Sequence, residues 1–230
     1  DEDIFICKYN SKGQVQWLRT HGNSQSDIGF ALDIDNKGNV YTTGSFSGKT
    51  DFDFSGKTHE LTPSGRSDIF LLSLDSLGNY KWAHKYGSKS TRSGENGRAI
   101  TYNNGRIYMA GTFNDTTDFD PSSKTYYLYQ PNVFLAIMDT LGNFEEAHSY
   151  GSHPQPEELF DISFSKNALY LCGAYRYDTD FDPSNTKEHF LLNKRGTDGY
   201  VLKLNVPVSC RHSFSSMNIS QCGSYTLPSG

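Results

Sequence analysis

The chain has 230 residues, of which 35% are hydrophobic and 14% aromatic, and a formal net charge of -5 with a pI near 5.8. This acidic balance gives no support for nucleic-acid binding, which requires a basic surface. No apolar run approaches the roughly 18–20 residues that span a bilayer, so we expect no membrane span in this chain. The length fits one large β domain or two small domains.

The predicted elements are strands, because no segment has a sustained helical period. Two strands are expected first, over residues 4–9 and 15–20. A later stretch gives the clearest pattern, with strands predicted over residues 98–102, 106–113, 132–139 and 144–150. Asn103-Asn104-Gly105 joins the first two of these strands and predicts a tight hairpin, since Asn and Gly accept positive φ. The apolar run from Val133 to Met138 predicts a strand buried on both faces.

An internal repeat organises these strands. The motif Thr-Asp-Phe-Asp begins at Thr50, Thr117 and Thr179, with intervals of 67 and 62 residues. A second marker recurs in the other half of the period, as Asp3-Ile4-Phe5, Asp68-Ile69-Phe70, Asn132-Val133-Phe134 and Asp198-Gly199-Tyr200. Each unit therefore carries four antiparallel strands and one long loop, and the period determines the fold class.

Four strands per repeat is the unit of a β-propeller blade. We predict an all-β fold, a β-propeller-type array of about three four-stranded antiparallel blades within residues 1–206. A partial blade covers residues 3–22, full units cover 23–87 and 88–151, and an incomplete unit covers 152–206. Since a closed propeller has roughly four to eight blades, we expect further blades upstream of Asp1 or closure by self-association.

The packing of the blades follows from the same pattern. The strands that begin near Phe30, Ala99 and Phe160 are predicted to be innermost. One aromatic residue per unit is predicted to be buried between sheets, and these residues are Phe46, Phe113 and Tyr175.

Two segments carry a resemblance to a known family. The stretch 38–44, Gly-Asn-Val-Tyr-Thr-Thr-Gly, resembles the core of the bacterial β-propeller repeat of the SBBP type, and so does the stretch 68–82. The Asp-Phe-Asp-Pro loops at 118–121 and 180–183 resemble the variant of secreted Bacteroidetes-type surface proteins. Residues 207–230 resemble a linker and the start of a Cys-containing extracellular module that follows surface domains exported by type IX secretion. The resemblance implies an extracellular or cell-surface bacterial protein.

The acidic loops are the candidate metal site, with the carboxylates of Asp51, Asp53, Asp118, Asp120, Asp180 and Asp182. The first loop has oxygen ligands at positions 1, 3 and 5 and Gly56 at position 6, which is how a calcium loop opens. The acidic residue expected at position 12 is missing, and two carboxylates with a hydroxyl fall short of the six to eight oxygens that Ca²⁺ takes. The alternative is that each Asp caps a turn by accepting backbone N–H groups, while Phe52, Phe119 and Phe181 fill the core.

The remaining residues indicate no chemistry of their own. No nucleophile–base pair and no metal-ligand spacing of His is found in the sequence, and no cofactor other than Ca²⁺ is indicated. Cys7 and Cys172 lie in apolar strand patterns, which predicts buried free thiols. Cys210 and Cys222 form a candidate disulfide if the protein is exported.

Two functional hypotheses follow. The first is a non-enzymatic extracellular or cell-surface module for adhesion, scaffolding, or interaction with a protein or a glycan. The second is an accessory carbohydrate-binding propeller domain of a secreted hydrolase, which a cluster of exposed Trp or Tyr would favour.

Overall fold

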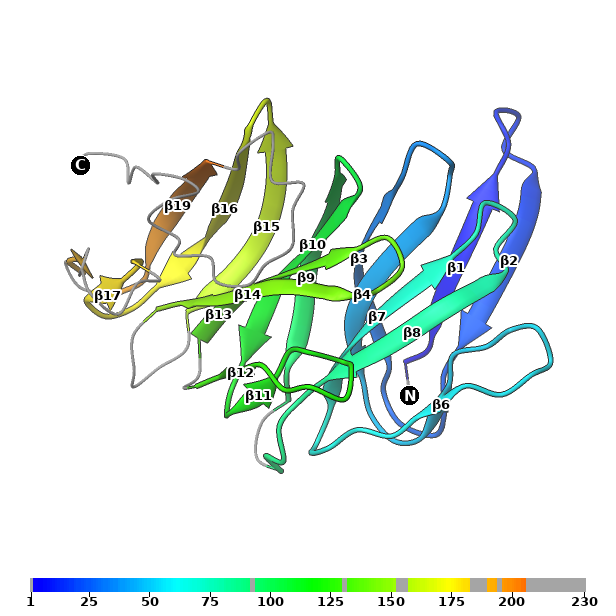
Figure 1. Ribbon diagram of the computed structural model, residues 1–230, viewed down its shortest axis with the longest axis horizontal. Coiled ribbons are helices and arrows are strands. Elements are labelled where there is room, and N and C mark those ends of the chain that lie inside the picture. Colours follow the sequence, from blue (N-terminus) through cyan, green and yellow to red (C-terminus); the bar gives the residue numbers. More distant parts are fainter. Residues whose placement is uncertain are drawn as a thin grey trace.

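The computed structural model describes residues 2–91, 94–129, 132–151, 157–182, 190–193 and 196–205 (Figure 1). Every regular element among them is a β-strand, and every strand pair is antiparallel. The described residues contain no helix long and apolar enough to cross a membrane. The prediction of an all-β fold of antiparallel sheets is confirmed.

Four main sheets follow one another along the chain. The first pairs β1 (Ile4–Tyr9) with β2 (Val15–His21). The second has the order β3 (Ile28–Ile34), β4 (Val40–Phe46), β7 (Asp68–Leu74) and β8 (Tyr80–Tyr86). The third has the order β9 (Asn96–Asn103), β10 (Arg106–Phe113), β13 (Asn132–Asp139) and β14 (Phe144–Tyr150). The fourth has the order β15 (Glu158–Ser165), β16 (Ala168–Tyr175) and β19 (Asp198–Asn205).

A short two-stranded ladder lies in the long loop of each unit. These ladders are β5 (Thr50–Asp51) with β6 (Glu60–Leu61), β11 (Thr117–Asp118) with β12 (Tyr127–Leu128), and β17 (Thr179–Asp180) with β18 (Phe190–Leu191). The sequence pattern did not predict them, because two residues per strand are too few to show an alternation. Each ladder begins at the repeated Thr-Asp, so it holds the acidic motif in the same place in every unit.

Local sequence accounts for the turns between the strands. Asn104 and Gly105 have φ of 49° and 85°, the left-handed values that a two-residue hairpin needs. The β7–β8 turn is closed by Asp75, whose Oδ1 accepts hydrogen bonds from the backbone N–H groups of Leu77 and Asn79 at 2.8 and 2.9 Å. Asp139 closes the β13–β14 turn in the same way, so the repeat of the sequence is also a repeat of turn chemistry.

Consecutive sheets pack face to face, and a hydrophobic core lies between each pair (Figure 1). Phe46, Phe113 and Tyr175 are buried in three successive cores, as predicted. The strand β9 lies against β3 of the sheet before it and against β15 of the sheet after it. The first strands of three successive sheets therefore form one continuous edge, which we call the inner edge. That this edge faces the centre of a propeller stays a prediction.

The two described cysteines correct one prediction. Cys7 and Cys172 are free thiols, but both are half-buried rather than fully buried. The reason is their place in the array: Cys7 lies on the outward face of the first sheet and Cys172 on the outward face of the fourth. No further described sheet covers either face.

Candidate functional site

The acidic loops predicted from the sequence all lie at the end of the second strand of their sheet. The phenylalanine of each motif is fully buried in the core, and these residues are Phe52, Phe119 and Phe181. The prediction that these three phenylalanines fill the core is confirmed.

The first carboxylate of each motif accepts hydrogen bonds from the backbone. Asp51 Oδ1 accepts from the N–H groups of Asp53 at 3.0 Å and His59 at 2.8 Å. Asp118 Oδ1 accepts in the same pattern from Asp120 and Tyr126, at 3.1 and 2.7 Å. These bonds fasten both ends of the loop to one carboxylate oxygen.

The third motif and the second carboxylates follow the same design. Asp180 Oδ1 accepts from the N–H of Asp182 at 2.9 Å. Asp53 and Asp120 accept from the N–H groups two residues later, Ser55 at 2.8 Å and Ser122 at 2.9 Å. The side-chain hydrogen bond from Ser55 holds the pKa of Asp53 below its ordinary value.

The structure brings the two Asp residues of one motif together but keeps the three motifs apart, each in its own loop. Among the described residues, no group of three or more His, Cys, Asp or Glu side chains converges as a metal site would require. The contacts support turn capping, and calcium binding at these loops stays a prediction.

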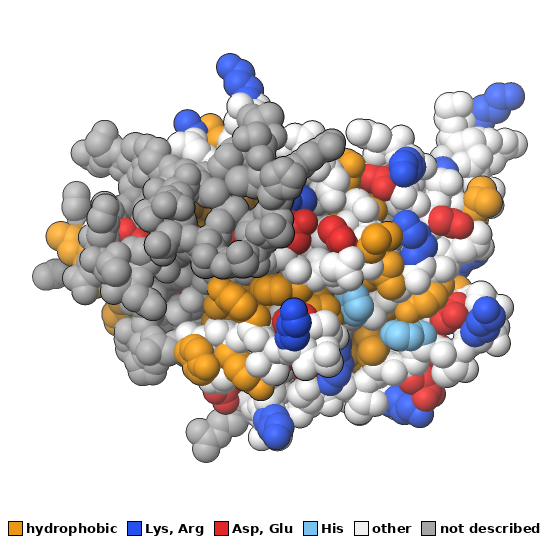
Figure 2. Space-filling view, in the orientation of Figure 1, with side chains coloured by type: hydrophobic (Ala, Val, Ile, Leu, Met, Phe, Trp, Pro, Cys, Tyr) orange, Lys and Arg blue, Asp and Glu red, His pale blue; other side chains and the backbone are white. Residues whose placement is uncertain are grey.

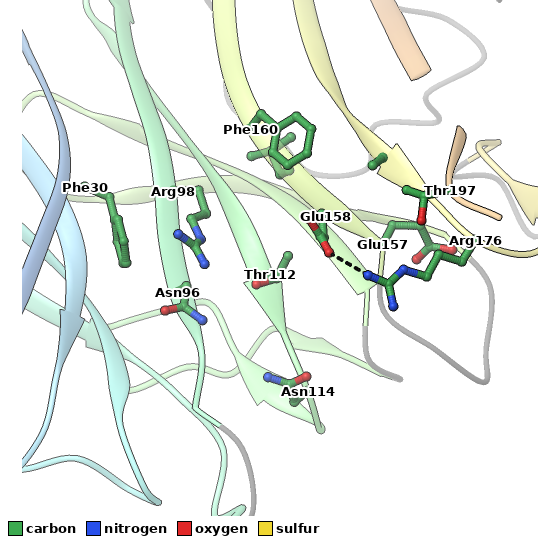
Figure 3. Close-up of a pocket in the computed structure, with 12 residues that line it drawn as sticks. Phe30, Asn96, Arg98, Thr112, Asn114, Glu157, Glu158, Phe160, Arg176 and Thr197 are labelled. Carbon is green, nitrogen blue, oxygen red and sulfur yellow. Dashed lines mark ion pairs between the residues drawn. The ribbon is translucent and has the colours of Figure 1, made fainter. Parts of the chain in front are cut away.

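A different site appears on the inner edge, where each of the strands β3, β9 and β15 carries a β-bulge. The register shifts skip Phe30 in β3, Arg98 in β9 and Phe160 in β15. A bulged residue is left out of the ladder and its side chain is re-aimed. The three equivalent bulges place these side chains in a row across three sheets (Figure 3).

The row borders a hollow of about 630 Å³ between the inner strands. Its lining is mostly polar, and besides the three bulge residues it includes Asn96, Thr112, Asn114, Glu157, Glu158, Arg176 and Thr197. Figure 3 shows these side chains coming from β9, β10, β15 and β16 and the segments beside them. Several polar groups converge on this hollow beside aromatic side chains, so we treat it as a candidate site for ligand binding.

The charges in the hollow are distributed unevenly. The Arg98 guanidinium lies 4.3 Å from the centroid of the Phe30 ring, a cation–π contact. Among the described residues, no carboxylate lies within ion-pair distance of Arg98. Arg176, by contrast, pairs with Glu158 at 3.5 Å (Figure 3). Arg98 therefore presents its N–H donors to the hollow, where an acidic group of a ligand would accept them.

Below the row, a buried acid precedes each inner strand: Asp27 before β3, Glu95 before β9 and Glu157 before β15. Burial raises the pKa of Asp27 to about 6 and that of Glu95 to about 7. The Ser88 hydroxyl donates to Glu95 at 2.5 Å, and the charge of Asp68 raises the pKa of Glu95 further. Each acid accepts a hydrogen bond from a neighbouring loop or short strand: Asp27 from the N–H of Ser47, Glu95 from Ser88 and Glu157 from the hydroxyl of Thr179.

The histidines of the fourth strands contact residues of their own strands. The His84 ring stacks on Trp82 with 5.1 Å between centroids, and burial lowers its pKa. His148 bonds to Glu146 of its own strand. Neither lies in the hollow.

Sequence reasoning predicted strands that begin near Phe30, Ala99 and Phe160 but missed the row of side chains on them. The usable signal is the position three residues after each buried acid, which is Phe30 after Asp27, Arg98 after Glu95 and Phe160 after Glu157. Its residue types differ, so no identity repeat marks it. The candidate disulfide between Cys210 and Cys222 lies outside the described residues.

Comparison with protein-family models finds no match for this chain, and comparison with curated proteins finds no matching relative.

Proposed function

We propose that this chain is an arc of β-propeller blades and acts as a non-enzymatic binding module at a bacterial cell surface, in adhesion or scaffolding. The repeated four-stranded sheets, their successive cores and the continuous inner edge support the propeller arrangement. The resemblance to SBBP-type repeats supports the extracellular setting.

The observation that carries the binding role is the row of Phe30, Arg98 and Phe160 above the hollow. Phe160 is 59% exposed beside the hollow, and Phe30 is half-buried. Arg98 lies between the two rings and is exposed. This arrangement favours an extended ligand with apolar faces and an acidic group near its centre.

The experiment is a binding screen of the 230-residue chain against acidic and neutral oligosaccharides and against acidic peptides. Binding of an acidic member that Arg98→Ala and Phe160→Ala each weaken about 10-fold or more would support the proposal. Lys89→Ala, an exposed residue outside the hollow, is the matched control. Binding that is unchanged in Arg98→Ala would remove the hollow from consideration.

A second candidate function is an accessory carbohydrate-binding domain of a secreted hydrolase, and one patch favours it. Tyr126, Tyr127 and Tyr129 are exposed around β12, and Figure 2 shows hydrophobic side chains gathered over the β11–β12 region. Tyr126 packs on Phe144 at 5.0 Å and Tyr127 on Tyr129 at 6.3 Å between centroids. Exposed tyrosines offer flat apolar rings with a polar end.

The two candidates differ in the residues on which binding depends. Loss of oligosaccharide binding in Tyr127→Ala and Tyr129→Ala, with Arg98→Ala unaffected, would favour the accessory domain. The reverse pattern would favour the hollow.

A further inference from the structure

One position of the repeat is buried in three sheets and exposed in the first. Phe70, Phe134 and Tyr200 stand at the same place in β7, β13 and β19, and their exposed fractions are 0%, 0% and 5%. Phe5 stands at that place in β1, and its exposed fraction is 70%. All four residues are aromatic, so the difference in exposure lies in what packs against each ring.

The cover in the other sheets is the phenylalanine of the acidic loop of the same unit. The ring centroids of Phe52 and Phe70 are 5.5 Å apart. The same distance is 4.7 Å between Phe119 and Phe134, and 4.5 Å between Phe181 and Tyr200. No described loop brings such a ring to Phe5.

A glycine of the second strand pairs with the aromatic residue in each unit. Gly44 pairs with Phe70, and a Cβ at Gly44 would lie 2.7 Å from that ring. Gly111 pairs with Phe134, where the same distance is 2.9 Å. Gly173 pairs with Tyr200 in the same way. The glycine leaves room for the ring, so the pairing of these two positions is sterically specified.

The strand β1 has β2 as its neighbour on one side and no described strand on the other. Its outward face carries Phe5, Cys7 and Tyr9, and Leu18 of β2 lies beside Cys7. An unpaired edge next to an exposed apolar face is an established template for strand addition.

We propose that β1 and its outward face bind a β-hairpin of a further repeat of this kind. The second strand of that hairpin pairs antiparallel with β1 and places a glycine opposite Phe5. The acidic loop that follows it places a phenylalanine ring on Phe5. The inference rests on the repeated sheets and not on the ligand of the hollow, so either proposal can fail without the other.

A second copy of this chain does not fit as the occupant. Each described hairpin that carries an acidic loop is already paired with its own third strand: β4 with β7, β10 with β13, and β16 with β19. A second copy would have to break one of these pairs before it offered the hairpin. The occupant is therefore a further repeat unit.

The test uses the full 230-residue chain and a fluorescent peptide of residues 94–129, which contains β9, β10 and the Asp118 loop. We expect fluorescence anisotropy to show saturable binding. Phe5→Asp should weaken it about 10-fold or more, because the substitution places a charge where a ring would be buried. Leu141→Asp is the matched control, since Leu141 is also 70% exposed but lies on the β13–β14 turn.

A disulfide tests the register of the added strand. Met109 pairs with Ala136, which stands where Cys7 does in β1. A Met109→Cys peptide should form a mixed disulfide with Cys7 in the presence of oxidised glutathione, which takes up the two electrons and two protons released by the thiols. Cys7→Ser in the chain should abolish the crosslink.

Three results would overturn the proposal. One is the absence of saturable binding by the peptide. Another is equal binding by wild type and Phe5→Asp. The last is self-association of the 230-residue chain that Phe5→Asp abolishes, which would assign the face to a second copy.

Discussion

The indole Nε1 of Trp82, in the fourth strand of one sheet, donates a hydrogen bond to the carbonyl oxygen of Thr140, 3.3 Å away in a turn of the next sheet. Trp17 makes the equivalent bond to Ser76 at 3.2 Å. Each tryptophan thus fastens one sheet to the β-turn of the sheet that follows. The third sheet has Glu146 at this position, so its junction with the fourth sheet lacks the tryptophan bond.

Removing the tryptophan should loosen the junction in two measurable steps. Trp82→Phe keeps an aromatic ring but loses the donor, and should lower the free energy of unfolding by about 1 kcal/mol. Trp82→Ala also loses the packing and should cost about 3 kcal/mol. Urea unfolding measures both, with the exposed Lys81→Ala as control. Equal costs for the two Trp82 variants would mean that the packing of the aromatic ring contributes nothing beyond the hydrogen bond.

The glycine of the turn should be required for two separable reasons. Gly142 and Gly105 both have φ of 85°, which is strained for a side chain by about 1 kcal/mol. A Cβ at Gly142 would lie 2.6 Å from His84 Nε2, whereas a Cβ at Gly105 meets nothing within 4 Å. Gly142→Ala should therefore destabilise the protein by about 1–3 kcal/mol more than Gly105→Ala. Equal losses in thermal unfolding would show that the His84 side chain moves aside freely.

The contribution of Glu95 to stability should fall as the pH rises from 5 to 8. The pKa of Glu95 is raised from its ordinary 4.5 to about 7, chiefly by burial, so the folded protein binds this proton more tightly than the unfolded chain. The resulting stabilisation is full below pH 4.5 and is lost as the pH passes through 7. The charged groups that face Glu95 are Asp68 and, through Asp68, Lys85 at 3.4 Å. The loss should reach about 2 kcal/mol.

The variant that checks this pH dependence is Glu95→Gln, which cannot ionise. It should flatten the part of the pH profile between 5 and 8, while Asp27, with its pKa raised to about 6, keeps a smaller dependence. Glu2→Gln, an exposed carboxylate, is the control. A difference in stability between wild type and Glu95→Gln that stays constant from pH 5 to 8 would contradict the burial of a protonated Glu95.

The calcium-binding and turn-capping interpretations predict different effects of calcium and of Asp118 substitutions on thermal unfolding. Asn retains the acceptor that holds Asp120 and Tyr126 but removes the charge, and Ala removes both. Under turn capping, unfolding temperatures in excess calcium and in chelator should agree, and only Asp118→Ala should lose about 1 kcal/mol. An increase of several degrees in calcium that Asp118→Asn diminishes would establish the metal site instead.

The sequence by itself determined the elements and their spacing. The strands at 106–113, 132–139 and 144–150 fall where the alternation places them, and the Asn104-Gly105 turn forms because these two residues accept positive φ. The buried aromatics Phe46 and Phe113 followed from the period. These features depend on residues close together in the chain, whose geometry is fixed by backbone sterics and side-chain alternation.

Tertiary structure decided which residues of different units meet. The row of Phe30, Arg98 and Phe160 exists because three bulges, more than 60 residues apart in the chain, come to lie on one edge. The exposure of Phe5 follows in the same way, because the sequence gives it the same pattern as Phe70 and only the packed sheets show that its cover is missing. Such contacts depend on how whole sheets are stacked, and no local pattern of residues specifies the stacking.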